Sequence, residues 1–347
     1  MTAPYKGALI GCGFFANNHM NAWAGIDRAR IVAVCDSDAD KARAMAERFG
    51  VANFYTDARE MLERERPDFT DIVTTSASHQ SLVELAAPLT RLVICQKPMA
   101  DTLEQARAMV AAAEAAGVPL LIHENFRWQK PFRDIARRIA AGELGQVHYA
   151  RFDFRHGYDN YKNQPYLAQI VRFSIMDVGL HLFDLTRSLV GEARSLACRA
   201  QRLNPIVRGE DAFTAMVGHD NGATSIVDCS FFSKLTPHRF PQTTAWIEGD
   251  RGTIDLGEDF QMIVHGPDGR ESFNLAPEVP RWGEKPWHII QDSVIAFCGH
   301  ALHVLDGTAE PQPSGADNAR TLAMAMAAYH AAETNSVVDL SNWGAAR

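Results

Sequence analysis

The segment VICQKPMAD, residues 93–101, places a lysine at the end of an apolar run. The run over 92–95 is typical of a buried strand, and proline cannot continue a central strand. Lysine is among the residues that proteins bury least. We therefore expect Lys97 at the edge of a sheet, where its ammonium group can reach a ligand. The alternative is an ordinary surface lysine at a bend.

A second group of reactive side chains lies in FSIMDVGLHLFDL, residues 173–185. Asp177 and His181 are four residues apart, so on a helix they share one face. Asp184 is three residues further and can approach the same face. A carboxylate can orient an imidazole and raise its basicity, which suits proton transfer at a hydroxyl group. The same spacing can instead bind a metal ion, although no second ligand cluster stands out, or His181 can be a buried structural histidine.

The segment ALIGCGFFANNH, residues 8–19, has the pattern of a dinucleotide-binding turn. Gly11 and Gly13 allow a tight turn and close approach of a pyrophosphate, and Ala16 allows a helix to pack against the strand. The following helix N-terminus would face the phosphates. Phe14 and Phe15 lie in this turn and are predicted to contact the cofactor. An ordinary strand-to-helix turn is the alternative.

Asp36 ends the second predicted strand, 20 residues after Ala16. A carboxylate at this place can accept the ribose hydroxyls and would repel a 2′-phosphate, so the pattern favours NAD over NADP. Lys41 and Arg43 can compensate a phosphate, but we interpret them as solvated helix residues. Asp36 can also simply initiate the next helix.

The segment TTSASHQ, residues 74–80, follows another predicted strand. Because ligands bind outside the carboxyl ends of parallel strands, Thr75, Ser76 and His79 are predicted to line the cofactor site. A helix cap at Ser76 or Ser78 is the alternative. Trp287, in PRWGEKPWHIIQ, is predicted to close over the cofactor, unless it only packs at the start of a helix.

Composition limits the class of protein. The chain has 347 residues, which favours two domains, and its 46% hydrophobic and 22% charged residues are ordinary for a soluble globular protein. A net charge of −8 without a basic stripe argues against nucleic acid as a partner. We expect no signal peptide and no membrane span. The six cysteines form no C-x-x-C, which favours free thiols in a reducing cytoplasm.

Strand and helix patterns alternate as far as residue 123, which predicts βαβ units and a parallel sheet. Afterwards, strands recur with tight turns such as HDNG and EGDRG, and helices are predicted over 286–303 and 315–333. The expected fold is α/β: an N-terminal Rossmann domain over 1–124, and a second α/β domain over 125–347 with a large, open, mostly antiparallel sheet.

The motifs GCGFFA, CQKP and DVGLHLFDL, in this order, resemble the Gfo/Idh/MocA oxidoreductases over essentially the whole chain. The resemblance implies an NAD-binding Rossmann domain and a second domain whose sheet commonly forms homodimers or homotetramers. It also implies that Lys97, Asp177 and His181 are catalytic, with His181 the acid/base. The Lys-Pro peptide bond in such proteins is often cis.

Two departures from the family pattern affect the site. Gln96, counted with the cofactor-binding residues, replaces the usual glutamate, which is expected to leave Lys97 easier to deprotonate. VRFSIMD replaces a small, glycine-rich run, so Arg172 is expected to reach the substrate, unless it lies on the surface. In HENFRWQ, Glu124, Asn125 and Arg127 are predicted to line the cleft. Asn125 and Arg127 are predicted to bind substrate together with Lys97, Asp177 and His181. Packing at a domain hinge is their alternative role.

These expectations combine into a cytoplasmic, NAD-dependent dehydrogenase of a sugar, with no metal. Oxidation of an aldose to a lactone is preferred, and a pentose such as the branched sugar D-apiose is one candidate substrate. Inositol or another polyol is the alternative substrate. A regulator that senses NAD without turnover is the alternative from another class, although no helix-turn-helix is evident.

Overall fold

The computed structural model describes residues 3–162, 164–237, 239–341 and 343. The chain divides into two compact units. The first comprises residues 1–128 and 279–320, and the second comprises 129–278 and 321–347. The first unit therefore includes residues 279–320. The expected boundary between residues 124 and 125 instead assigns these residues to the second domain.

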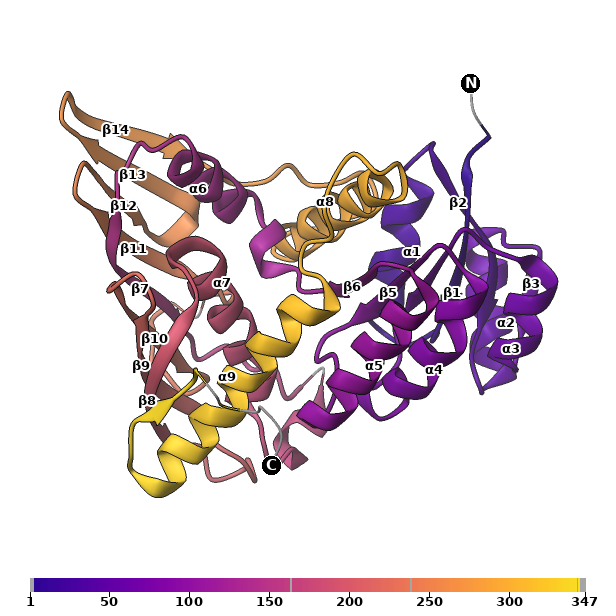
Figure 1. Cartoon of the computed structure of the whole chain (residues 1–347), viewed down its shortest axis with the longest axis horizontal. Coiled ribbons are helices and arrows are strands. Elements are labelled where there is room, and N and C mark those ends of the chain that lie inside the picture. The colour runs from indigo at the N-terminus through magenta and orange to yellow at the C-terminus, as the bar shows by residue number, and fades with distance from the viewer. Residues whose placement is uncertain (1–2, 163, 238, 342, 344–347) are drawn as a thin grey trace. The chain divides into compact units, whose positions relative to one another are not determined.

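A six-stranded parallel sheet forms the centre of the first unit, with the strand order β3-β2-β1-β4-β5-β6 (Figure 1). Its strands are β1 (Tyr5–Ile10), β2 (Ala29–Cys35), β3 (Asn53–Tyr55), β4 (Phe69–Ile72), β5 (Leu92–Gln96) and β6 (Leu120–His123). The strands β4, β5 and β6 are buried at every position, which explains the apolar runs of β5 and β6. The order reverses between β1 and β4, and in such sheets ligands bind at that point.

Capping residues begin and end several of the helices of this unit. Its helices are α1 (Ala16–Ala24), α2 (Ala39–Phe49), α3 (Ala58–Glu65), α4 (His79–Ala86) and α5 (Leu103–Ala116), with short 3-10 turns at Ser76–Ser78, Ala87–Leu89 and Phe126–Trp128. Asp38 caps α2 by accepting from the backbone of Asp40, and Thr102 forms a capping box with Gln105. Gly50 and Gly117 end α2 and α5 with φ of 65° and 66°.

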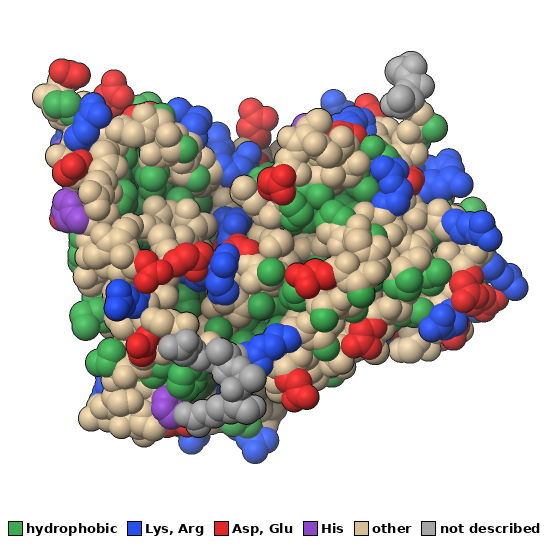
Figure 2. All heavy atoms as spheres, viewed as in Figure 1, with side chains coloured by type: hydrophobic (Ala, Val, Ile, Leu, Met, Phe, Trp, Pro, Cys, Tyr) green, Lys and Arg blue, Asp and Glu red, His purple; other side chains and the backbone are tan. Residues whose placement is uncertain are grey.

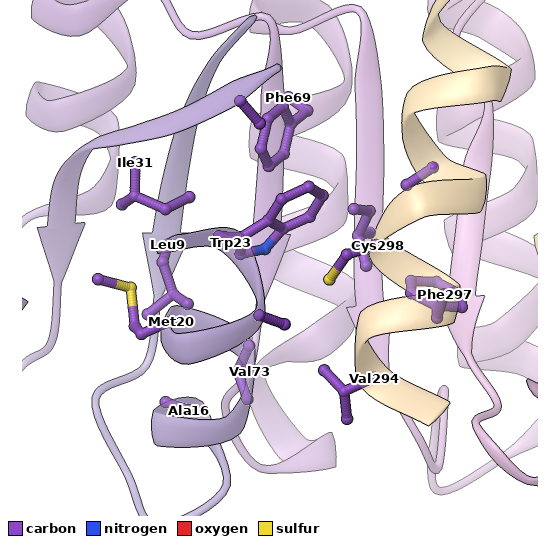
Figure 3. Close-up of a cluster of buried hydrophobic side chains, with 14 of the residues drawn as sticks. Leu9, Ala16, Met20, Trp23, Ile31, Phe69, Val73, Val294, Phe297 and Cys298 are labelled. Carbon is purple, nitrogen blue, oxygen red and sulfur yellow. The ribbon is translucent and has the colours of Figure 1, made fainter. Parts of the chain in front are cut away.

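Helix α8 (His288–Leu305) completes the core of the first unit. Figure 3 shows Val294, Phe297 and Cys298 of α8 in one cluster with Trp23 and Phe69. The rings of Trp23 and Phe69 lie 4.5 Å apart between centroids. Each large side chain buried here contributes about 1.5–3 kcal/mol. This packing is why residues 279–320 belong with the Rossmann sheet.

A nine-stranded sheet forms the second unit, in the order β14-β13-β12-β11-β7-β10-β9-β8-β15. Its strands are β7 (Val147–Arg155), β8 (Ala193–Gln201), β9 (Ala212–His219), β10 (Thr224–Ser230), β11 (Thr244–Gly249), β12 (Thr253–Leu256), β13 (Gln261–Gly266), β14 (Gly269–Asn274) and β15 (Val338–Asp339). The pair β7–β10 is parallel, and the other pairs are antiparallel. The predicted fold class is thereby confirmed.

The remaining helices are α6 (Lys130–Ala140), α7 (Leu180–Val190) and α9 (Gly315–Thr334), with 3-10 turns at Pro165–Gln169 and Glu258–Phe260. Residues Ile175–Gly179, just before α7, form a π-helix. A π-helical turn is rare and is frequent at functional sites. This turn carries Asp177.

No helix in the described part of the chain has the length and apolar character needed to cross a membrane. Figure 2 shows acidic and basic side chains interspersed over the visible face.

Candidate active site

The turn after β1 has the backbone that a dinucleotide needs. Gly11 has φ +97°, and a Cβ there would lie 2.6 Å from the backbone oxygen of Val73. A side chain is therefore excluded at this position, both by sterics and by backbone conformation. A Cβ at Gly13 would meet nothing within 4 Å, so space is open beside that backbone. This arrangement fits the close approach of a pyrophosphate.

Asp36 ties the end of β2 to this turn. Its Oδ2 accepts a hydrogen bond from the backbone N of Cys12 at 2.8 Å, and its Oδ1 accepts from the backbone N of Asp38 at 2.9 Å. Each carboxylate oxygen has a second lone pair that can accept a ribose hydroxyl. Asp36 is partly exposed, so the observed geometry fits the adenosine ribose of NAD.

The residues that flank the turn divide into exposed and buried ones. Phe14 is exposed, whereas Phe15 is half-buried and Ala16, the first residue of α1, is completely buried. The ring of Phe15 stands edge-on to the rings of His19 and His123. Phe14 is therefore free to contact a bound cofactor, while Phe15 packs the turn onto the sheet.

The predicted residues after β4 have different environments. Thr75 is exposed, and Ser76 Oγ donates to Asp101 Oδ1 at 2.5 Å. His79 is completely buried. Its Nδ1 lies 3.0 Å from the backbone oxygen of Pro98, and its Nε2 lies 3.2 Å from that of Thr74. His79 thus links the loops after β4 and β5, which favours a positioning role over direct cofactor contact.

Behind the end of β5 lies a buried polar cluster that consists of His19, Asp71, Gln96 and His123. Asp71 Oδ2 binds His19 Nδ1 at 2.8 Å. Gln96 Nε2 lies 3.4 Å from His19 Nε2, and Gln96 Oε1 lies 3.3 Å from His123 Nδ1. Gln96 Oε1 also accepts from the backbone N of Lys97 at 2.7 Å. The cluster therefore fixes the backbone that carries the lysine.

Lys97 follows β5 directly and is partly exposed. The Lys97–Pro98 peptide bond is cis, as the resemblance implies. Glu124, which directly follows the neighbouring strand β6, is completely buried. Burial raises the pKa of Glu124 to about 7, against the opposing effect of the positive charges of Lys97 and Arg127.

Two predicted substrate residues of the first unit are held by its own side chains. Asn125 is buried, and its Nδ2 donates to Ser293 Oγ of α8 at 2.9 Å. Arg127 forms an ion pair with Asp317 at 3.2 Å. These contacts favour their alternative role in packing. Trp287, which is partly exposed, precedes α8 as its N-cap residue.

In the second unit, the π-helix and α7 carry Asp177 and His181. Asp177 is partly exposed, whereas His181 and Asp184 are buried. Glu210 fixes the start of this segment, because its Oε1 accepts from the backbone N of Ile175 at 3.0 Å. The two predicted catalytic residues therefore stand four positions apart on one continuous helical segment.

Arg172 and Glu210 share a partner in this unit. The Arg172 guanidinium lies over the ring of Tyr329, 5.2 Å from its centroid, and Glu210 accepts from the Tyr329 hydroxyl at 2.7 Å. Arg172 itself is exposed, so the stack holds its position while its donors remain accessible.

His156 is a candidate site residue that the sequence did not indicate. It follows β7 and is buried between Phe154 and Phe231. Burial lowers its pKa to about 4, although the nearby charge of Asp177 acts in the opposite direction. Its Nδ1 accepts from the backbone N of Tyr158, so the neutral ring carries its proton on Nε2. Among the described residues, Nε2 has no hydrogen-bond partner.

No group of three or more metal-binding side chains occurs among the described residues. The first unit thus combines a dinucleotide turn, Asp36 and Lys97 at the carboxyl edge of its sheet. The second unit combines Asp177, His181 and His156. A Rossmann sheet with these features defines a nucleotide-binding oxidoreductase.

Comparison with known proteins agrees with this class. Residues 5–124 match the oxidoreductase family with an NAD-binding Rossmann fold, and residues 132–255 match the GFO/IDH/MocA C-terminal domain. The chain belongs to the Gfo/Idh/MocA oxidoreductase family, and it is an NAD-binding dehydrogenase.

Two curated relatives are similar over nearly their full length. The D-apiose dehydrogenase of Paraburkholderia graminis is 45% identical over 97% of this chain and 90% of its own. The D-apiose dehydrogenase of Rhizobium rhizogenes is 43% identical over 96% of this chain and 97% of its own.

A solved structure is similar to the whole chain. It is an oxidoreductase from Agrobacterium radiobacter in complex with NAD+, L-tartaric acid and magnesium. Its TM-score is 0.94 at 43% identity, and the match covers 98% of this chain and 99% of that one.

Proposed function

We propose that the protein oxidises an aldose, with D-apiose as the preferred substrate, to the corresponding lactone with NAD. The observation that carries the substrate is the similarity to two D-apiose dehydrogenases, at 45% and 43% identity. Proteins named for myo-inositol and scyllo-inositol are less similar, at 27% and 26% identity over shorter segments. D-Apiose is therefore favoured over the polyols.

The proposed chemistry assigns one role to each polar group. NAD, when bound, supplies the hydride acceptor. His181 accepts the proton of the reacting hydroxyl group, and Asp177 orients it and favours its protonated form. Lys97 donates a hydrogen bond to the reacting oxygen. His156 Nε2 and Arg172 donate to further hydroxyl groups of the sugar.

A substrate screen tests the proposed activity. Reduction of NAD, followed by NADH absorbance, is measured with D-apiose, other pentoses, hexoses, myo-inositol and L-tartrate. We expect the largest kcat/KM with D-apiose. A larger value with myo-inositol would transfer the assignment to a polyol dehydrogenase. Tight NAD binding without turnover on any of these compounds would favour the regulator.

The nine-stranded sheet supports a homodimer or homotetramer as part of the proposal. Four residues form a row across four neighbouring strands. Met216 of β9 pairs with Ile226 of β10, Ile226 pairs with Arg151 of β7, and Arg151 pairs with Trp246 of β11. Met216 and Trp246 are 53% and 39% exposed, which is unusual for such large apolar side chains. We infer that this row packs against a second copy of the chain.

A cytoplasmic location is the remaining part of the proposal. All six cysteines are free and buried. Desolvation raises the pKa of each thiol, which keeps the thiols protonated and unreactive. A reducing compartment suits such a set of thiols.

A further inference from the structure

Position 96 carries an amide where the family motif has a glutamate. The Gln96 side chain is 8% exposed and is held by His19, His123 and the backbone N of Lys97. These contacts use its oxygen and its amide group within the buried cluster. Gln96 therefore positions the backbone of Lys97 but brings no negative charge to it.

A carboxylate is present on the neighbouring strand. In the parallel pair of β5 and β6, Gln96 is opposite His123. Lys97 and Glu124 are the next residues of the two strands, so they leave the same edge of the sheet side by side. Glu124 has an exposed fraction of 0%. A carboxylate buried to this extent is costly unless a positive charge compensates it.

Two cations act on Glu124. Burial raises the pKa of Glu124 to about 7, and the positive charge of Lys97, followed by that of Arg127, opposes this rise. Arg127 already shares its charge with Asp317, at 3.2 Å. Lys97 is therefore the principal counter-charge of Glu124.

We propose that Glu124 is a positioning residue of the active site, the carboxylate that holds the Lys97 ammonium group in place of the glutamate missing at position 96. The proposal rests on the proposed role of Lys97 in the reaction. It replaces the expectation that Gln96 leaves Lys97 easier to deprotonate, because an adjacent carboxylate favours the charged lysine.

Other titratable groups contact the residues next to this pair in the chain, or one another. His123 comes from β6, His19 from α1, Asp71 from β4 and His79 from α4. Arg127 and its partner Asp317 complete the surroundings together with His300 of α8, which stacks on Trp128 with ring centroids 4.5 Å apart. Burial lowers the pKa of His79, and it lowers that of His300 to about 4, so burial favours the neutral form of each ring.

The test measures the ionisation of Lys97 directly. Lysines are dimethylated with 13C-formaldehyde in the full-length protein, and the Lys97 resonance is assigned by its absence in Lys97→Arg. Its pH titration is compared between the wild type, Glu124→Gln and the exposed control Glu114→Gln. We expect Glu124→Gln to move the titration of Lys97 to lower pH by about 1–3 units, and the control to leave it unchanged.

Moving the carboxylate provides the rescue. The double variant Gln96→Glu/Glu124→Gln is expected to return the titration of Lys97 at least halfway to its wild-type position. In the pH profile of kcat/KM, the limb caused by the ionisation of Lys97 should shift in each variant in the same direction as the NMR titration. An unchanged titration in folded Glu124→Gln would overturn the proposal.

Folding defects are also informative. If Glu124→Gln does not fold, recovery of folding by Gln96→Glu supports the proposal, and failure to recover contradicts it. Failure of the proposed function is a separate outcome, since it is indicated by the absence of D-apiose turnover in the wild type. Near-normal turnover of Lys97→Ala would instead contradict the proposed role of Lys97. The NMR titration needs neither cofactor nor substrate, so it judges the Glu124–Lys97 pair independently.

Discussion

His19 Nδ1 and Asp71 Oδ2 lie 2.8 Å apart, and both side chains have an exposed fraction of 0%. Asp71 Oδ2 also accepts from Trp23 Nε1 at 2.7 Å. Because the carboxylate accepts from His19 Nδ1, Nε2 of the neutral ring is the acceptor for Gln96 Nε2–H. The orientation of the Gln96 side chain therefore depends on the carboxylate of Asp71 on the neighbouring strand β4. The backbone at Lys97 depends on it in turn, because Gln96 accepts from the backbone N of Lys97.

Asp71→Asn is therefore expected to destabilise the protein. The substitution removes a buried charge that accepts two hydrogen bonds, and such a loss costs about 3 kcal/mol. The midpoint of urea unfolding should fall clearly. Asp40→Asn, on the exposed surface of α2, is the control and should leave the midpoint within error. An unchanged midpoint in Asp71→Asn would show that the pair contributes no net stability.

Asp36→Ala is expected to weaken NAD binding by about 10- to 100-fold, because it removes the acceptor for the ribose and the anchor of the Cys12 backbone. Binding of NADP should change much less, since the repulsion of its phosphate is relieved. Fluorescence titrations with NADH and NADPH measure both constants. Asp40→Ala is the matched control. Equal weakening for the two cofactors would contradict the assignment of Asp36 to the ribose.

His156→Gln is expected to raise KM for the sugar more than it lowers kcat. The pH dependence of stability provides a second readout. Burial lowers the folded-state pKa of His156 to about 4, below the ordinary histidine value of 6.5, so the unfolded state binds the proton more tightly. Acidification from pH 6.5 to 4 should therefore destabilise the wild type, by at most about 3 kcal/mol from this group. The variant should lack this part of the loss.

Substitution of the exposed row on the nine-stranded sheet tests assembly. Met216→Asp/Trp246→Asp is expected to yield smaller particles in light scattering than the wild type, because charge is introduced into an apolar contact. The control Glu271→Gln, on β14, should keep the wild-type mass. A monomeric wild type at micromolar concentration would contradict the proposed interface.

The parts of the fold that have a local signal were predictable. The sequence indicates Gly11 because a tight turn requires glycine, and Gly13 because a close approach to the backbone does. It indicates Asp36 because a carboxylate at the end of the second strand can accept ribose hydroxyls. Lys97 is recognisable because an apolar run stops at it. The strand β5, which ends just before Lys97, is buried at every position and leaves a continuous apolar pattern over 92–95.

The remainder depends on contacts between distant residues. Helix α8 joins the first unit because Phe297 and Cys298 pack with Trp23, more than 270 positions earlier, and no local pattern encodes this. The strands β13 and β14 have no local signal in the sequence, because their residues are largely exposed and lack alternation. His156 has no motif, and its role becomes visible only through its burial and its proximity to Asp177.

The catalytic assignment itself is tested with Lys97 and His181. Each residue is proposed to bind or accept a proton at the reacting hydroxyl, a contribution worth about 100- to 10,000-fold in rate. Lys97→Ala and His181→Ala should each lower kcat by about this factor, while NAD binding should change little because Gly11, Gly13 and Asp36 are the residues proposed to hold the cofactor. The double variant should lose much less than the product of the single losses, since groups that act as a unit are not additive.

Lys130→Ala is the control for the lysine, since Lys130 Nζ donates to the backbone oxygen of Ala276 at 3.0 Å within the second unit. It should retain turnover. Steady-state kinetics with D-apiose, together with NADH titration of each variant, separates a loss of chemistry from a loss of binding. If Lys97→Ala keeps near-normal kcat, the lysine is only a residue at the bend after β5, and the proton chemistry must be carried by other groups.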